Sequence, residues 1–395
     1  MKTPRPILRF PQLLSVGALA ASLLALLGAA GAAEPTRGTR VVPAREIVTY
    51  PDGRPPARFR LEARDHGPVL KHGDGPEQCD YLGARDVWVF EQDGSFYMHY
   101  DGAGVQGWLA CLAVSTDLVH WTKRGPALPL GEKGRMDSAS ASYGTTYRDG
   151  DTWHMFYLGT PNTSPPPDRV PWFPYTTMKA KAATPAGPWT KQYDVTPFRP
   201  QHGSYYSDTA SPGHIVRHGG EYLMFFAAST DKPILRTLSI ARTRDLDGPW
   251  TVDPRPIVPS EEQVENSSLY YEPANQTWFL FTNHIGISTY RDLGLDDKNL
   301  PKELGNQTGP ATVEYTDSIW VYWTKDLNRW DPANKAVVLD GRNCAWSTTC
   351  IGLPSVVKQG DRLALFYDAP GGRSISHMRR DIGLAWLDLP LIPPQ

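Results

Sequence analysis

The chain has 395 residues and a formal net charge of −2, and nothing in this balance suits nucleic acid or an anionic surface as a partner. Its 13 Trp, 18 Tyr and 12 Phe, beside 37 Pro and 35 Gly, disfavour a helix-rich fold. The composition therefore predicts an all-β chain with many turns, and its 40% hydrophobic residues are sufficient for a sizeable core.

The first 33 residues have the pattern of a secretory signal peptide. Three basic residues stand among the first nine, an uncharged run rich in Leu and Ala follows from Leu13, and small residues close it at Ala33. The alternative is an uncleaved membrane anchor, because the apolar run approaches spanning length. We expect cleavage, a secreted or periplasmic location with no membrane contact beyond export, and a single domain over residues 34–395.

Four cysteines offer little chemistry. Cys344 and Cys350 are close enough in sequence for a local disulfide, and Cys79 and Cys111 could form another in an exported protein. No pair has the C-x-x-C spacing of a zinc site. We therefore expect structural bridges or buried thiols, and no metal.

A tight turn followed by an aromatic, alternating strand recurs along the chain. Each copy follows a short apolar segment, so the repeated unit is a β-hairpin. The turns stand at five places: Asp93-Gly94, Gly150-Asp151, Gly219-Gly220, Asn275-Gln276 and Gly360-Asp361.

A second element, Asp-Leu-x-x-Trp or a variant of it, follows the first four hairpins. Its tryptophans are 68, 61 and 80 residues apart, at Trp121, Trp189, Trp250 and Trp330. Units of this length predict four-stranded blades, here a five-bladed β-propeller with a central active-site channel. The fifth copy is truncated at Trp386, so an N-terminal strand from residues 40–50 or 58–63 would complete the last blade.

Carboxylates stand at the start of the predicted innermost strands, which line the channel: Asp86, Asp137, Asp208 and Glu265. Two carboxylates facing each other across a channel suit glycoside hydrolysis. One protonates the leaving oxygen, and the other stays ionised to activate water or attack the sugar carbon. A third can raise the pKa of the acid. Asp86, Asp208 and Glu265 fit these three roles.

Two segments resemble a known enzyme group. Ala84-Arg85-Asp86-Val87, with the hairpin that follows it, is similar to the first blade of the five-bladed glycoside hydrolases of family 43 and its relatives in families 32, 62, 68, 117 and 130. Glu265-Asn266-Ser267-Ser268 is similar to the family 43 segment that bears the general acid. The resemblance is nearest to family 43. It implies Asp86 as general base, Glu265 as general acid, Asp208 as the residue that tunes Glu265, and inversion at the anomeric carbon.

The chain departs from the family 43 pattern in three ways. Asp86 is followed by Val where Pro is usual, and Ser211-Pro212 stands where Asp-Pro is usual, so Asp208 is displaced by three residues. Asp137 lies in the second blade, where families 32 and 68 carry a stabilising Asp. The third carboxylate and the stereochemistry stay open, because Asp86 would be a nucleophile in a retaining enzyme.

Six further residues are expected to contact substrate. The histidines among them could instead be buried and hydrogen-bonded, the aspartate structural, and the tryptophans part of the core. They are Asp137, His214, His284, His377, Trp108 and Trp172. Trp172 lies in a proline-rich insertion over residues 161–174, where exposure favours stacking on a sugar.

The resemblance implies a carbohydrate partner and no cofactor, although some relatives hold a calcium ion in the central channel. Two other functions stay open. A glycoside phosphorylase, as in family 130, would need a basic cluster for phosphate, to which Arg373, Arg379 and Arg380 could contribute. A non-catalytic carbohydrate-binding propeller would keep Asp86 and Glu265 far apart.

Overall fold

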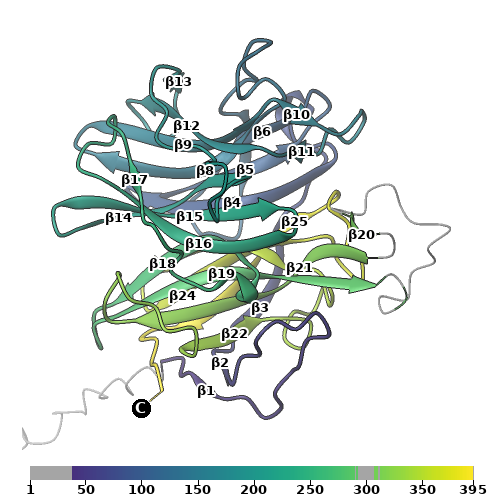
Figure 1. Ribbon diagram of the computed structural model, residues 1–395, viewed down its shortest axis with the longest axis vertical. Coiled ribbons are helices and arrows are strands. Elements are labelled where there is room, and N and C mark those ends of the chain that lie inside the picture. Colours follow the sequence, from purple (N-terminus) through teal and green to yellow (C-terminus); the bar gives the residue numbers. More distant parts are fainter. Residues whose placement is uncertain (1–37, 290, 292–306, 310–311, 395) are drawn as a thin grey trace, which may run out of the picture. The chain divides into compact units, whose positions relative to one another are not determined.

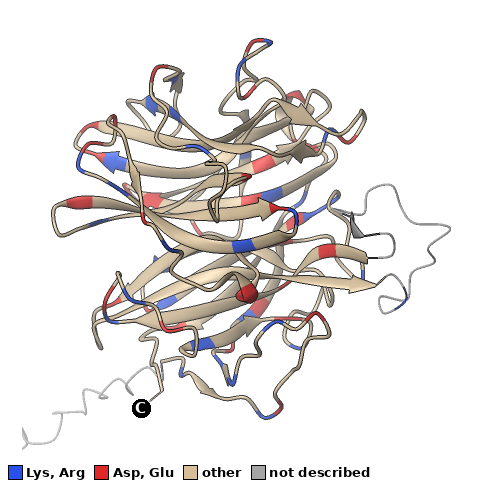
Figure 2. Cartoon of the chain, in the orientation of Figure 1, with Lys and Arg blue, Asp and Glu red and all other residues tan. Residues whose placement is uncertain are grey.

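The computed structural model describes residues 38–289, 291, 307–309 and 312–394, and the predicted signal peptide lies outside them. Within these residues the structure is nearly all β, with two short 3₁₀ turns at Pro76–Gln78 and Ser260–Glu262 (Figure 1). None of the helices described there has the length and apolarity to cross a bilayer. Charged residues of both signs are mixed along the strands and loops (Figure 2).

All five predicted hairpins are present. The Asp93-Gly94 turn shows why they form: both residues have positive φ, 53° and 77°, as the tight turn of a two-residue hairpin requires. The pairs are β4 (Gly83–Gln92) with β5 (Ser95–Ala103), β8 (Ser140–Asp149) with β9 (Thr152–Thr160), β14 (Thr209–His218) with β15 (Glu221–Asp231), β18 (Val264–Glu272) with β19 (Thr277–Thr289), and β23 (Gly352–Gln359) with β24 (Arg362–Ala369).

Two more antiparallel strands extend each hairpin to a four-stranded unit. They are β6 (Trp108–Ser115) and β7 (Thr122–Pro126), β12 (Tyr175–Ala182) and β13 (Thr190–Lys191), β16 (Ile234–Thr243) and β17 (Thr251–Val252), β21 (Thr312–Thr324) and β22 (Lys335–Leu339), and β25 (Asp381–Asp388) and β3 (Arg64–Leu70). Short strands β10 (Asn162–Thr163) and β11 (Pro171–Trp172) pair with each other, and β20 (Gln307–Gly309) pairs with β21.

The Asp-Leu-x-x-Trp element turns the chain into the outermost strand. In the first unit, Leu118 is fully buried and its carbonyl accepts a hydrogen bond from the indole of Trp121, directly before β7. Leu327 and Trp330 repeat this contact before β22. The motif therefore anchors the turn by one buried leucine and one local hydrogen bond.

The strand that completes the last unit differs from the prediction. It is β3, not residues 40–50 or 58–63. β2 (Phe59–Arg60) instead pairs in parallel with β22, and β1 (Val42–Pro43) pairs with β2. An edge strand needs few apolar residues, so β3 gave little hydrophobic signal. Apolar side chains of the earlier segment, such as Leu61, pack into the core instead.

The first strands of the five units contact one another in a cycle: β4 with β8, β8 with β14, β14 with β18, β18 with β23, and β23 with β4. Hydrogen bonds join them side to side. The Val89 amide donates to Ser355 Oγ (2.9 Å), and the Val356 amide donates to Ser268 Oγ (2.9 Å). Each first strand also carries a bulge near its start, and this repeated irregularity turns side chains out of the ladder.

All four cysteines are buried free thiols, which is one of the two alternatives predicted for them, and the disulfides of the other alternative are not formed. Cys350 Sγ accepts a hydrogen bond from the buried Arg380 guanidinium (3.1 Å), and Cys344 Sγ lies 3.5 Å from the Tyr367 hydroxyl. Cys344 and Cys350 thus contact different partners, and their short separation in the sequence does not lead to a disulfide.

A buried ion pair ties the fourth unit to the 3₁₀ turn before β18. The Lys335 ammonium lies 2.5 and 2.7 Å from the two carboxylate oxygens of Glu262, which also accepts a hydrogen bond from the Tyr322 hydroxyl (2.7 Å). Glu262→Gln leaves a buried ammonium without its counter-charge, so we expect the free energy of unfolding to fall by about 3–5 kcal/mol in urea titrations. The exposed neighbour provides the control, Glu261→Gln. Equal stability of the two variants would contradict this reading.

Candidate active site

The five bulges line one cavity. Each supplies one residue: Asp86, Tyr143, Pro212, Asn266 and Leu353. Three of them, Asp86, Asn266 and Leu353, hold left-handed backbone with φ of 49°, 57° and 62°. Such φ values are costly outside glycine and are commonest at functional sites. The cavity encloses about 740 Å³, including the solvent at its mouth.

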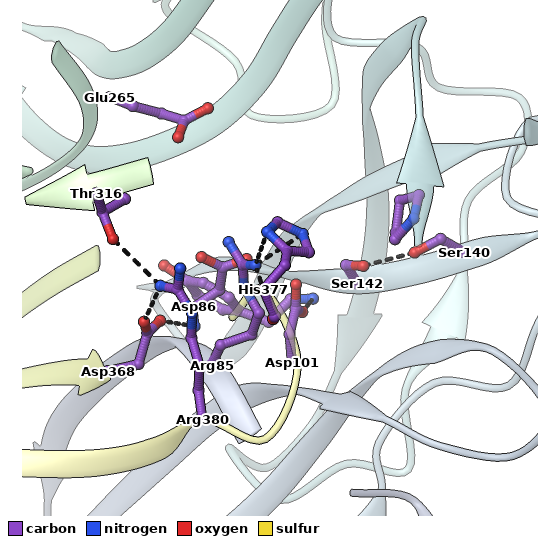
Figure 3. Close-up of polar contacts among 12 residues, drawn as sticks. Arg85, Asp86, Asp101, Ser140, Ser142, Glu265, Thr316, Asp368, His377 and Arg380 are labelled. Atoms are coloured by element: carbon purple, nitrogen blue, oxygen red, sulfur yellow. Dashed lines mark hydrogen bonds and ion pairs between the residues drawn. The ribbon is translucent and has the colours of Figure 1, made fainter. Parts of the chain in front are cut away.

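Asp86, on β4, and Glu265, on β18, both line this cavity. Figure 3 shows Glu265 on one side, and Asp86 with Arg85 and His377 on the other. Asp86 is held through its backbone, because its amide donates to the Asp368 carboxylate (2.8 Å). Asp368 is in turn paired with the buried Arg380 (2.6 Å). Asp86, the candidate general base, is thus fixed through its backbone by a buried ion pair.

A third carboxylate, Asp101, lies against Asp86 and also lines the cavity. The two share a side-chain hydrogen bond, and the Tyr143 amide donates to Asp101 Oδ1. Burial and the charge of Asp86 raise the pKa of Asp101 well above its usual range. Burial also raises the pKa of Asp86, against the opposing effect of Arg85. The pair therefore retains one proton under conditions where isolated aspartates lose theirs, and Asp101 carries it.

Asp101 was not predicted, because it lies at the end of the second strand of its hairpin and only carboxylates at the starts of first strands were candidates. In a hairpin, the end of the second strand returns beside the start of the first, and here Asp101 is paired with Arg85 across the ladder. Counting outward from the Asp93-Gly94 turn would have found it. The same count places Asn283 opposite Glu265.

Glu265 is bound on one oxygen only. Arg236, from β16, donates to its Oε1 (2.7 Å) and also pairs with Glu314. No side chain among the described residues donates to Glu265 Oε2, so that oxygen is the one available for a substrate. An acid placed in this way can transfer a proton to an oxygen in the cavity.

Arg85, His377 and Trp108 form the adjoining wall. The His377 ring lies 2.8 Å from Arg85 Nη1 and stacks on Trp108, with 5.5 Å between ring centroids. Burial, and then Arg85, Arg380 and Arg236, lower the pKa of His377 well below its usual range. The imidazole is therefore neutral at ordinary pH and accepts from Arg85. Of the six predicted substrate contacts, only His377 and Trp108 line the cavity.

Asp208 does not take the position predicted for it. It precedes β14, and its carboxylate is bound by the Ser207 hydroxyl (2.5 Å) rather than by Glu265. The residue of β14 that corresponds to Glu265 is Ser211, three positions further on, which lines the cavity. The three-residue displacement of Asp208 seen in the sequence is therefore present in the structure, and Asp208 does not line the cavity.

Asp137 is fully buried away from the cavity lining. Its Oδ2 is bound by Lys191 (2.5 Å) and by the Tyr157 hydroxyl (2.8 Å). It precedes β8 and lies five residues before Ser142, so the geometry assigns it to the packing of the second unit and not to substrate contact.

His214 and His284 hold strands together. His214 Nδ1 accepts from the Leu269 amide (2.9 Å), and burial lowers the pKa of His214 to about 3. His284 stacks on Trp320 with 3.9 Å between centroids, and neither histidine lines the cavity. Trp172 is 44% exposed on β11, next to Pro171, which does line it, so Trp172 lies at the rim.

A channel calcium ion, as in some relatives, would be coordinated mostly by water, so its presence stays a prediction. Over 38–289, 291, 307–309 and 312–394, no three His, Cys, Asp or Glu side chains gather as a site with several protein ligands requires. Ser267, Ser268 and His214 between the first strands are committed to neighbouring strands. No step of the chemistry is therefore assigned to such an ion.

No protein-family model and no curated protein matches the chain. Solved structures share its fold. The catalytic domain of a family 62 α-L-arabinofuranosidase from Coprinopsis cinerea is 12% identical, with a TM-score of 0.53 over 82% of this chain and 97% of that one. Zg3597, a family 117 glycoside hydrolase from the marine bacterium Zobellia galactanivorans, is 14% identical, with a TM-score of 0.52 over 83% and 91%.

A thermostable family 43 glycoside hydrolase is 12% identical, with a TM-score of 0.50 over 82% of this chain and 98% of that one. The expected likeness to this group of glycoside hydrolases is thus confirmed at the level of the fold. The structures do not single out family 43, so the nearer resemblance to it stays a prediction.

Proposed function

We propose that the chain is an exported glycoside hydrolase built as a five-bladed β-propeller, with Asp86 and Glu265 as its acid–base pair at the central channel. The observation that carries the proposal is the meeting of these two carboxylates, from β4 and β18, in one cavity. The cycle of contacts among the five first strands supports the blade count. The fold shared with glycoside hydrolases supports the reaction class.

The mechanism assigns one role to each carboxyl group. Asp86 takes a proton from water as the water oxygen attacks the anomeric carbon. Glu265 gives a proton from Oε2 to the leaving oxygen as the glycosidic bond breaks on the other face of the sugar. The result is hydrolysis with inversion. Asp101, protonated, donates a hydrogen bond that keeps Asp86 ionised and oriented, whereas the role predicted for Asp208 was to tune Glu265.

Replacement of Asp101 separates this role from general packing. Asn keeps a neutral donor toward Asp86 and an acceptor for the Tyr143 amide, so Asp101→Asn should retain most activity. Asp101→Ala removes the donor that lowers the pKa of Asp86, so the acidic limb of kcat/KM should move to higher pH and the rate should fall by about 10-fold to 10²-fold. pH–rate profiles of both variants measure this. Identical acidic limbs in Asp101→Ala and the unaltered protein would remove Asp101 from the mechanism.

The proposed function is tested by a screen of the purified protein on aryl glycosides and on plant and algal polysaccharides. We expect release of reducing sugar from at least one substrate, with product of inverted anomeric configuration in early ¹H NMR spectra. Sugar binding without turnover on any substrate would instead favour the carbohydrate-binding alternative.

One observation favours a second candidate, a glycoside phosphorylase. Arg85, Arg236 and the neutral His377 line the cavity, and the two arginines provide positive charge for phosphate that the sequence did not reveal. Arg373, Arg379 and Arg380, suggested from the sequence, do not line it. Turnover that requires inorganic phosphate and yields a sugar phosphate would establish this candidate over the hydrolase.

A further inference from the structure

Two nearly buried arginines in the cavity keep donors that no protein group uses. Arg85 and Arg236 are 7% and 4% exposed, and they come from β4 and β16. Arg85 Nη1 is bound to His377, and Arg236 uses Nε and Nη1 for Glu314 and Glu265. Among the described residues, neither Nη2 group has an acceptor, and Arg85 Nε, which has no hydrogen-bond partner, lies 3.4 Å from Asp86 Oδ2 as an ion pair.

The two guanidinium groups stand at the junction of two cavities. A second hollow of about 380 Å³ adjoins the first, and the two share four residues: Arg85, Arg236, Glu265 and His377. A group bound beside Glu265 can therefore reach both arginines. The position is next to the bond to be cleaved, and not at the rim of the site.

Each guanidinium group already faces one carboxylate in the state that reacts. Arg236 pairs with Glu314, and Arg85 Nε lies 3.4 Å from Asp86 Oδ2. Catalysis by the proposed mechanism needs protons on Asp101 and Glu265, so these two carboxyl groups then add no negative charge. The unused Nη2 donors are left for an acceptor on the substrate, and charge-assisted hydrogen bonds to an anionic acceptor are about twice as strong as neutral ones.

We propose that Arg85 and Arg236 form a subsite for the carboxylate of an acidic sugar, so that the preferred substrate is a glycoside of a uronic acid. This inference rests on the proposed glycosidase function. The shared chemistry is recognition of an oxyanion, and a carboxylate suits it better than phosphate does. A carboxylate brings one negative charge near Asp86 and Glu314, whereas a phosphate dianion brings two and meets stronger repulsion from both.

The test compares sugars that differ only in the carboxylate. Calorimetry with the full chain measures binding of D-galacturonate against D-galactose, D-glucuronate against D-glucose, and inorganic phosphate. Aryl uronides and the matching aryl hexosides give the ratio of kcat/KM values. We expect the acidic member of at least one pair to bind about 10-fold or more tightly and to react about 10²-fold or more efficiently. Phosphate should neither bind competitively nor be required.

Arg85→Gln supplies the matched comparison. It should reduce the acidic-to-neutral ratio by about 10²-fold, a readout that general damage to the site would not move. The control is Arg242→Gln, on the same strand as Arg236 but paired with Asp253, and it should leave the ratio unchanged. If Arg85→Gln does not fold, the acidic-to-neutral ratios measured with the unaltered protein still decide whether the cavity prefers a uronic acid.

The outcomes distinguish a failure of the proposed subsite from a failure of the proposed hydrolase function. Hydrolysis of neutral and acidic glycosides at equal efficiency would overturn the subsite and leave the proposed function standing. Tight uronate binding without any hydrolysis would uphold the subsite and contradict the function. A strict phosphate requirement would overturn both and assign the arginines to phosphorolysis.

Discussion

Asp86→Asn is expected to lower kcat by about 10³-fold on every substrate, because the amide cannot accept a proton from the attacking water. The fold should persist. Asp86 is held by its backbone amide bonded to Asp368, and the substitution leaves that contact in place. The side chain also keeps its size, and Asn tolerates the left-handed φ of 49° at this position.

The control for Asp86 is Asp93→Asn in the exposed turn of the same hairpin, where Asn also suits the positive φ. It should have unaltered rates. Far-ultraviolet circular dichroism and urea midpoints of both variants report on folding. Rates within a few-fold of the unaltered protein in a folded Asp86→Asn variant would exclude Asp86 as the base.

Glu265→Gln is expected to show a loss that depends on the leaving group. Poor leaving groups, such as sugar alcohols, need protonation, so their hydrolysis should fall by about 10²-fold to 10⁴-fold. A 2,4-dinitrophenyl leaving group departs without a proton, so its glycoside should be hydrolysed almost as fast as by the unaltered protein. This contrast follows from the place of Glu265, whose Oε2 is open to the cavity while Oε1 is bound to Arg236.

The same pair of substrates distinguishes the two carboxylates, because Asp86→Asn should impair both equally. The exposed Glu261→Gln serves again as the control. An equal loss for both leaving groups in Glu265→Gln would show that Glu265 positions the substrate and does not donate the proton.

Much of the fold could be predicted because it depends on local chemistry repeated along the chain. A turn such as Asp93-Gly94 requires positive φ and marks a hairpin wherever it recurs. The Asp-Leu-x-x-Trp element marks the outer strand by one buried leucine and one indole hydrogen bond. The closing strand β3 could not be found in this way. It is an edge strand, and its pairing with β25, over 300 residues later, has no local signal.

Four residues predicted from the sequence line the cavity, and two of them, Trp108 and His377, lie outside the first strands. Asp86 and Glu265 lie at strand starts, and the structure brings both into one cavity. Asp208 was misplaced because the distance from an acid to the bulge decides whether it faces the cavity, and bulges do not show in a sequence. Arg236 lies on the third strand of its unit, so only the assembled structure shows that it meets Glu265. Asp101 could have been predicted by counting residues outward from the Asp93-Gly94 turn.

A crystal structure of the Glu265→Gln variant with an oligosaccharide substrate should show one sugar bound between Asp86 and position 265. We expect a water molecule bound to Asp86 on one side of the anomeric carbon, and the glycosidic oxygen within about 2.6–3.2 Å of the amide at position 265. A sugar bound elsewhere, or with its anomeric carbon out of reach of Asp86, would exclude the two carboxylates as the catalytic pair.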